Sequence, residues 1–324
     1  KRQMKYFVLG AIASGMLLYG MSILYGLSGS LAIADVANAV SAVEQGSDAQ
    51  LGLVFALVFI VVALAFKLGA VPFHMWIPDV YQGAPTAVTA YISSAPKIAG
   101  FAIIIRLLVE GLGGLHGDWQ MMLVILAVLS MAAGNIIAIA QTNIKRMLAY
   151  STISHVGFIL LGILAGTADG YSSAMFYTLA YTFITLGAFG TVILLERREY
   201  AGETISDYAG LAQRAPLLAS LMLVFMLALT GIPPTGGFFG KVYLFAAAVE
   251  AGWTWVAVIG VLTSAISLYY YMGVVVQMYL KSSEKDTPVP LRSPVLGATL
   301  VFCAVATVIL GIFPGFFVEF AKSS

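Results

Sequence analysis

The feature of this sequence that most constrains its fold is a series of long, nearly uncharged apolar runs. Three of the clearest are VFALVFIVVALAF (54–66), MMLVILAVLSMAA (121–133) and LLASLMLVFMLAL (217–229). Each belongs to a longer stretch that can cross a hydrocarbon core of ~30 Å as a helix. The runs lack the strict apolar/polar alternation of a membrane β-barrel. Only 10% of the residues are charged, against about a quarter in soluble domains, so the sequence predicts an all-α polytopic membrane protein.

We predict about nine transmembrane helices, two of them interrupted: 4–27, 51–81 (interrupted), 85–110, 118–141, 145–168, 171–195, 214–250 (interrupted), 253–280 and 294–318. With these crossings, eleven basic residues fall on the side where the first helix begins, and Lys322 alone falls on the other side. The positive-inside rule then places the basic loops in the cytoplasm. The eleven are Lys1, Arg2, Lys5, Lys145, Arg146, Arg197, Arg198, Arg214, Lys281, Lys285 and Arg292.

Three lysines, Lys67, Lys97 and Lys241, are predicted to lie deep inside the membrane-embedded helices. Arg106 is near a helix end, from which its long side chain can reach water. All fifteen acidic residues are predicted in loops or at helix ends. A charged lysine at bilayer depth costs at least ~2.5–3.5 kcal/mol. Because burial disfavours the charged form, such a lysine can bind and release a proton, which makes it a candidate proton carrier.

Two predicted helices are interrupted by glycine and proline, in FKLGAVPFHMWIPDVYQGAP (66–85) and LTGIPPTGGFFGKVYLF (229–245). Non-helical backbone at membrane depth is tolerated only where protein buries it or where it lines a cavity. Paired interrupted helices are typical of transport sites between inverted repeats. Lys67 precedes the first break and Lys241 follows the second. The alternatives are that each break is a packing kink, and that each lysine caps carbonyl groups freed at a break.

Polar side chains between the lysines could carry a proton wire. They comprise His74, Thr142, Asn143, Ser151, Thr152, Ser154, His155, Tyr177, Tyr181, Thr182 and Thr185. The alternative is that they hydrogen-bond helices together, or that His74 only caps or gates its segment. The sequence has no CxxC, no GxGxxG after a strand and no phosphate loop, and its single cysteine, Cys303, suits packing. We therefore expect no cofactor in this chain, and its net charge of +1 gives no sign of nucleic-acid binding.

Three segments resemble the antiporter-like membrane subunits of the bacterial proton-pumping NADH:quinone oxidoreductase, respiratory complex I. They are FKLGAVPFHMWIPDVYQGAPTAVTAYISSAPKIAGF (66–101), QTNIKRMLAYSTISHVGF (141–158) and LTGIPPTGGFFGKVYLF (229–245). The spelling PFHMWIPDVYQGAP resembles the N type, which is subunit 2 of the mitochondrial enzyme. The lysine in GGFFGK differs from the M type, which typically has a glutamate there. The related L type, Mrp-type cation/proton antiporters and membrane-bound hydrogenase subunits share the architecture.

The resemblance implies a fold of fourteen helices with two inverted five-helix repeats, of which this chain resembles helices six to fourteen. Residues 1–110 would be the later part of the first repeat (helices six to eight), 118–281 the second repeat and 290–324 a C-terminal helix. It implies that Lys67 is the lysine of the first broken helix and Lys97 the central connecting lysine. It likewise implies that Lys241 serves the exit half-channel and Lys5 the cytoplasmic entrance.

The resemblance also implies partners and cofactors. The partners would be the K-, J-, M- and L-type membrane subunits and the lipid bilayer, and the FMN, the iron–sulfur clusters and the quinone would be bound by partner subunits. The glutamate that pairs with the first broken-helix lysine in the family lies one helix before this chain begins, and Lys1-Arg2-Gln3 stands where the family usually has a further glutamate. We therefore expect a segment of a longer protein or a processed chain. A cation/proton antiporter or hydrogenase subunit, and a lysine-capped scaffold without transport, are the alternative functions.

Overall fold

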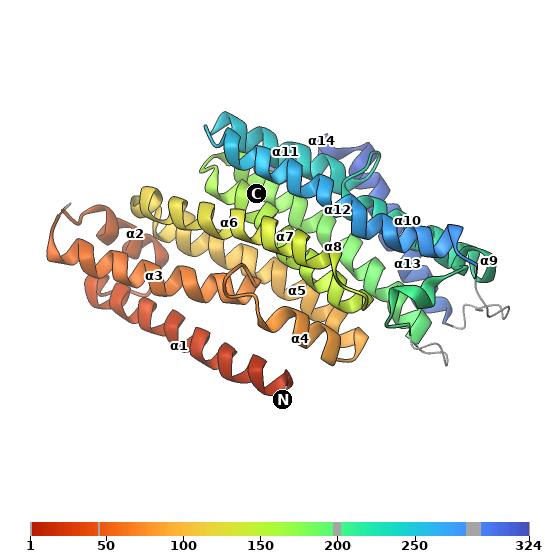
Figure 1. Ribbon diagram of the computed structural model, residues 1–324. Coiled ribbons are helices and arrows are strands. Elements are labelled where there is room, and N and C mark those ends of the chain that lie inside the picture. The colour runs from red at the N-terminus through yellow and green to blue at the C-terminus, as the bar shows by residue number, and fades with distance from the viewer. Residues whose placement is uncertain (1, 45, 197–201, 283–292, 324) are drawn as a thin grey trace.

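The computed structural model describes residues 2–44, 46–196, 202–282 and 293–323, and these form a bundle of long, side-by-side helices (Figure 1). Among the described residues eight helical segments are long and apolar enough to cross a membrane. They are α1 (Arg2–Ser28), α3 (Asp48–Leu68), α5 (Thr86–Ile104) continued by the π-helix η1 (Ile105–Gly111), α6 (His116–Ile139), α7 (Ile144–Leu164), α8 (Ala168–Glu196), α12 (Thr254–Leu280) and α13 (Pro294–Ile312). The remaining predicted crossing, 214–250, is the pair α10 (Pro216–Thr230) and α11 (Gly236–Glu250), of 15 residues each. The chain is thus an all-helical, multi-pass membrane protein, as predicted.

Shorter helices occupy the connections: α2 (Ile33–Ser41), α4 (Trp76–Gly83), η2 (Gly113–Leu115), η3 (Ile205–Tyr208), α9 (Leu211–Arg214) and α14 (Pro314–Ser323). The predicted crossing 294–318 is divided, because α13 ends at Ile312 and Pro314 begins α14. Proline is favoured at the first position of a helix, where its missing N–H is not needed. Five of the basic residues used in the orientation argument lie outside the described residues: Lys1, Arg197, Arg198, Lys285 and Arg292.

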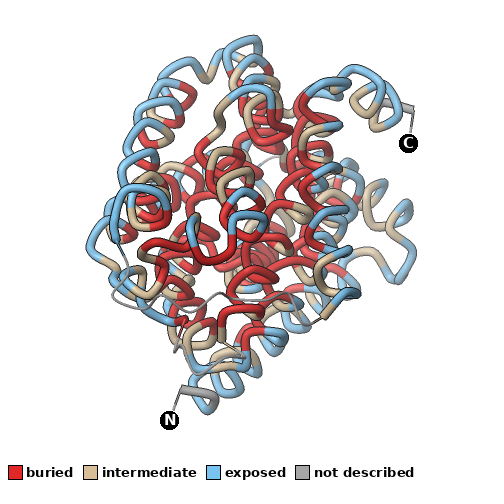
Figure 2. The backbone as a smooth tube through the Cα atoms, turned by 90° about the vertical axis from the view of Figure 1, so that its right-hand side faces the viewer, coloured by how far each residue is buried: buried red, intermediate tan, exposed pale blue. Residues whose placement is uncertain are grey.

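The buried centre of the bundle is α7 together with α8. Almost every residue of α7 is buried, and α8 packs against α5, α7, α10, α11 and α13. The buried residues concentrate along the middle of the bundle and the exposed ones lie around it (Figure 2). At one edge α1 packs mainly on α3, and its outer face presents large apolar side chains such as Phe7 and Leu18. A helix that is apolar on its exposed face suits contact with lipid or another membrane helix.

Carboxylates are confined to the ends of the bundle. Every described aspartate and glutamate lies in a loop, in a short helix, or near the first or last turn of a long helical segment. The middle of the described bundle therefore holds lysines without a neighbouring carboxylate, as the sequence predicted.

Candidate functional site

The first helix break follows α3 and is created by local backbone chemistry. Gly69 has φ +80°, and its N–H donates to the Ala65 and Phe66 carbonyls at 2.8 and 3.0 Å. Only glycine adopts this left-handed conformation without a steric cost. A Cβ at Gly69 would also lie 1.8 Å from Cδ1 of Ile77. The helix therefore ends here and resumes at α4, which leaves the Leu68 carbonyl to find a donor outside its own helix.

That donor is Lys97, on α5. The side chain of Lys97 is only 1% exposed, and its Nζ donates to the Leu68 carbonyl oxygen. The same Nζ lies 5.6 Å from the centroid of the Trp76 ring. A cation is favoured at a helix C-terminus, where the backbone dipoles present their negative ends. The lysine that occupies the first break is thus Lys97, which belongs to the predicted uninterrupted helix 85–110.

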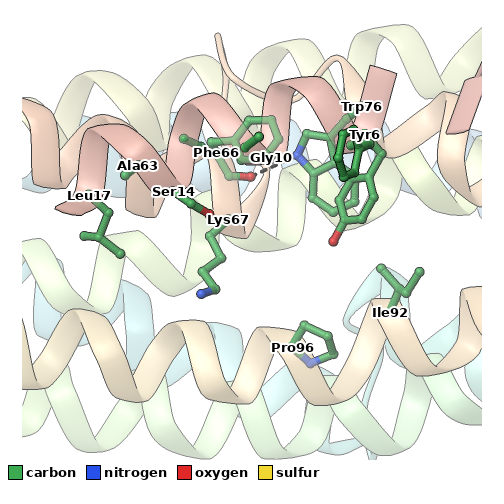
Figure 3. A pocket seen from close by; sticks show the side chains of 13 residues that line it. Tyr6, Gly10, Ser14, Leu17, Ala63, Phe66, Lys67, Trp76, Ile92 and Pro96 are labelled. Atoms are coloured by element: carbon green, nitrogen blue, oxygen red, sulfur yellow. Dashed lines mark hydrogen bonds between the residues drawn. The ribbon is translucent and has the colours of Figure 1, made fainter. Parts of the chain in front are cut away.

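Lys67 differs from Lys97 in its surroundings. It lies in the candidate membrane span Asp48–Leu68, as predicted, but its side chain is exposed on the described chain and does not occupy the helix break. It projects from α3 into a pocket of about 440 Å³, with Tyr6 of α1, Trp76 and Pro96 of α5 among the lining residues (Figure 3). The side chain makes no hydrogen bond or ion pair with the described residues, because its neighbours in this pocket are mainly apolar.

The second break, between α10 and α11, repeats the arrangement of the first. Gly231 has φ +89° and ends α10. Lys241, on α11, is 4% exposed and donates to the Leu229 and Thr230 carbonyls at 3.1 and 2.9 Å. Its third donor reaches Oγ of Ser264 on α12 at 2.7 Å. All three N–H groups of the ammonium are thereby satisfied by neutral acceptors, and the Phe158 ring lies 4.9 Å from Nζ.

His155, predicted as part of a proton wire, is 3% exposed and joins two helices to α7. Its Nδ1 is hydrogen-bonded to the Tyr177 hydroxyl at 2.5 Å, and its Nε2 to the Tyr271 hydroxyl at 3.1 Å. Tyr271 is also hydrogen-bonded to Ser151. This chain of exchangeable protons runs along α7, α8 and α12, so His155 lies in a continuous polar cluster.

The other predicted wire residues are only partly connected. Tyr181 donates to Thr152 at 2.8 Å, whereas Thr182 bonds only to a carbonyl of its own helix. The Thr185 hydroxyl and the His74 Nδ1 are buried and lie outside the hydrogen-bonded cluster that the described residues form around His155. His74 lies in the first break, ahead of α4, and no contact joins it to either buried lysine among the described residues.

Lys5 lies at the end of the bundle that carries the basic loops. It donates to Asp79 of α4 at 2.8 Å, and Arg146 of α7 donates to the same carboxylate at 3.4 Å. The hydrogen bond from Lys5 holds the pKa of the Asp79 carboxyl below its usual value, with a further contribution from Arg146. Asp79 lies outside the eight candidate spans. These contacts tie α1, α4 and α7 together beside the Lys67 pocket.

Two residues of α12 that were not predicted from the sequence contact Lys241 and His155. Ser264 reaches Lys241 and Tyr271 reaches His155, while Tyr270 donates to Asn135 on α6 at 2.8 Å. Positions 264, 267, 270 and 271 are spaced so that they share one helix face. That spacing of hydroxyl groups in an otherwise apolar helix was the signal available in the sequence.

Chemically, the site consists of two ammonium positions and a hydroxyl–imidazole cluster. The described residues include no group of three or more His, Cys, Asp or Glu side chains that could hold a metal ion. What the arrangement offers is proton binding at Lys97, Lys241 and His155, each held by hydrogen bonds from or to neutral groups.

Comparison with known proteins shows the family to which the chain is related. Residues 2–267 match the family model described as NADH:quinone oxidoreductase/Mrp antiporter, TM. The chain is 55% identical over 321 residues to the NADH-quinone oxidoreductase subunit N of Thioalkalivibrio sulfidiphilus, covering 99% of this chain and 66% of that protein. With the subunit N of Thiobacillus denitrificans the identity is 54%, covering 96% of this chain and 64% of that protein. The chain thus spans slightly less than two thirds of the length of these relatives.

Solved structures show the same helix arrangement. A chain of respiratory complex I from Thermus thermophilus with bound aureothin superposes with a TM-score of 0.82 at 34% identity, covering 98% of this chain and 68% of that chain. A chain of the Mrp complex from Dietzia sp. superposes with a TM-score of 0.89 at 23% identity, covering 99% and 67%. The second similarity concerns the fold alone.

Proposed function

The chain belongs to the NADH:quinone oxidoreductase/Mrp antiporter family of membrane subunits, and we propose that it is a proton-translocating N-type subunit of NADH:quinone oxidoreductase. The observation that carries the proposal is the pair of capped breaks: Lys97 and Lys241 are buried, and each donates to carbonyl groups freed at a helix break. Neither has a carboxylate partner among the described residues. Such an ammonium can be neutralised only by losing its proton, which is the chemistry of a relay.

The order of the relay follows the bundle. We propose that protons pass from the side of Lys5 to Lys67, then to Lys97, His155 and Lys241. Lys67 projects into an open, largely apolar pocket, so its counter-charge would come from outside the described residues. The family glutamate that pairs with this lysine is the candidate. His74, half-buried in the first break, would gate access and not carry the proton.

The remaining assignments concern the whole assembly. Redox chemistry would occur in partner subunits that bind FMN, iron–sulfur clusters and quinone, and the K-, J-, M- and L-type subunits would be neighbours in the membrane. The basic loops would face the cytoplasm of a bacterium, across its inner membrane. Residues 1–110 and 118–281 would belong to two inverted repeats, followed by the C-terminal helix 290–324, of which 290–292 lie outside the described residues. Support comes from the relatives' 55% and 54% identity.

The experiment is proton pumping by the assembled complex carrying single lysine substitutions in this chain. Lys67→Met, Lys97→Met and Lys241→Met should each lower the number of protons moved per NADH oxidised, with assembly preserved. Arg106→Gln is the matched control, because its side chain is 64% exposed and its one ion pair among the described residues is with Glu110, four positions on. Unchanged pumping in all three lysine variants would support a lysine-capped scaffold instead.

Two further comparisons separate the alternatives. Lys241→Arg should impair pumping more than assembly, because arginine keeps its charge at any physiological pH. The subunits that co-purify with the chain distinguish an NADH-linked complex from an Mrp-type antiporter or a membrane-bound hydrogenase. Recovery of only antiporter subunits would reject the NADH linkage while leaving proton translocation standing.

A further inference from the structure

Trp76 lies where the Lys67 pocket meets the buried site of Lys97. It is the first residue of α4 and is only 3% exposed. Its ring lines the pocket into which Lys67 projects, and the Tyr6 ring lies 4.9 Å away (Figure 3). Its indole N–H donates to the Phe66 carbonyl at 2.9 Å. This hydrogen bond fixes the ring across the helix break.

The same indole is in contact with Lys97. The Lys97 Nζ lies 5.6 Å from the ring centroid, within the ~6 Å over which a ring face attracts a cation. The attraction acts on the ammonium and not on the neutral amine, because it depends on the positive charge. The ring therefore holds a charged Lys97 against the Leu68 carbonyl, where its Nζ donates.

The indole of Trp76 also cannot relay a proton from the Lys67 pocket to Lys97. The N–H is already engaged by Phe66, and the ring face has no group that accepts and re-donates a proton. The Phe66 ring, whose centroid lies 5.8 Å from that of the Trp76 ring, adds to this apolar barrier between the pocket and Lys97. Across the pocket, Ile92 and Pro96 are apolar as well. A proton moving from Lys67 to Lys97 therefore needs either a displaced indole or water admitted past it.

We propose that Trp76 is a positioning residue that separates the Lys67 pocket from Lys97 and orients Lys97 on the Leu68 carbonyl, so that a proton passes only when the indole moves. The inference rests on the proposed relay function and deepens it. It predicts two separable consequences of losing the ring: weaker retention of the proton on Lys97, and easier entry of water to Lys97 from the pocket.

Trp119 provides a matched control for substitutions of Trp76. Its side chain is fully buried, and its indole N–H donates to the Leu112 carbonyl at 3.0 Å. Its ring packs on His116 at 4.5 Å, and it contacts no lysine in the part of the chain that the structure describes. Trp119→Leu therefore removes a buried indole and its hydrogen bond without touching the relay.

The first measurement is the number of protons moved per NADH oxidised by the assembled complex in proteoliposomes. Trp76→Leu should lower this ratio, by at most the loss that Lys97→Met causes, and Trp76→Phe should restore most of it because the ring face that attracts the ammonium returns. Trp119→Leu should leave the ratio unchanged. If Lys97→Met lowers the ratio but W76L leaves it equal to that of W119L, the inference about Trp76 is overturned. If Lys97→Met and Lys67→Met also leave the ratio unchanged, the proposed function itself fails.

The second measurement does not depend on pumping. In membranes containing the full chain, Lys97→Cys is treated with a small water-soluble methanethiosulfonate, in the parent and in the W76L and W119L backgrounds. Labelling should be several-fold faster with W76L than with either of the others, because the ring no longer blocks the pocket. Equal rates in the three backgrounds overturn the separating role, even where W76L lowers pumping or prevents assembly.

Discussion

Gly69→Ala should destabilise the protein through the first helix break, by an amount that follows from the geometry. Gly69 has φ +80°, and a Cβ there would meet Cδ1 of Ile77 at 1.8 Å. A left-handed alanine costs about 1–2 kcal/mol, and forcing Ile77 off its rotamer costs about 0.5–1.5 kcal/mol. The free energy of unfolding should therefore fall by about 1.5–3.5 kcal/mol.

The comparison that isolates the steric part is Gly252→Ala. Gly252 has φ +85°, but a Cβ there would meet nothing within 4 Å. It should cost only the left-handed part, about 1–2 kcal/mol. Both variants are measured by titrating the purified chain with SDS in mixed micelles, followed by tryptophan emission. The double variant G69A/I77V should lose less stability than the sum of its single changes, because Ile77→Val removes the clashing Cδ1.

Equal destabilisation by Gly69→Ala and Gly252→Ala would refute the steric argument. It would mean that Ile77 rotates away freely despite being fully buried. A second consequence can be checked in the assembled complex. Because Gly69 adjoins Leu68, whose carbonyl accepts from Lys97, a shift of this break should also lower pumping per NADH oxidised, and Gly252→Ala should not.

Three other outcomes follow from contacts at the site. Ser264→Ala removes the 2.7 Å hydrogen bond to Lys241; a hydrogen bond to a charged group contributes about 1.5–3 kcal/mol, so pumping per NADH oxidised should fall several-fold with assembly intact. Tyr271→Phe removes the hydroxyl bonded to His155 and should cost about 1–3 kcal/mol of stability by leaving a buried partner unsatisfied, measured by SDS titration. The folded-state pKa of Asp79 is lowered, so its ionised carboxylate stabilises the protein above the unfolded pKa of about 3.9. This contribution is lost as the pH falls from the unfolded pKa through the lower folded-state pKa. Asp79→Asn should therefore destabilise the protein at pH 6 and progressively less in acid.

Each of these has a matched control. Ser267→Ala also removes a hydroxyl from α12, but one that donates to the Ser264 carbonyl and does not contact Lys241 among the described residues. Pumping should therefore persist, and a loss equal to that of Ser264→Ala would count against the Lys241 contact. Tyr270→Phe tests whether loss of any α12 phenol disturbs His155, and only Tyr271→Phe should shift the His155 NMR resonance. A constant difference between parent and Asp79→Asn from pH 6 to pH 3 would contradict the assignment of the carboxylate contribution.

The sequence by itself determined the class of fold, because the features that decide it are local. An apolar run long enough to cross a membrane must form a helix, since its backbone groups have no other partners in lipid. Closely spaced glycine and proline residues in 66–85 and 229–245 predicted that these two helices are interrupted, and the breaks lie at 69–75 and 231–235. The confinement of carboxylates to helix ends followed from the same reasoning.

Only the tertiary structure decided which lysine occupies which break. The sequence joined Lys67 to the first break because they are neighbours along the chain, whereas Lys97 of α5 caps it and Lys67 faces an open pocket. The contacts of Ser264 and Tyr271 were likewise not predicted. The physical reason is that a membrane helix is apolar on all sides, so its sequence carries little information about which face turns inward. That rotation is set by packing against all neighbouring helices at once, and it decides where each polar side chain finds its partner.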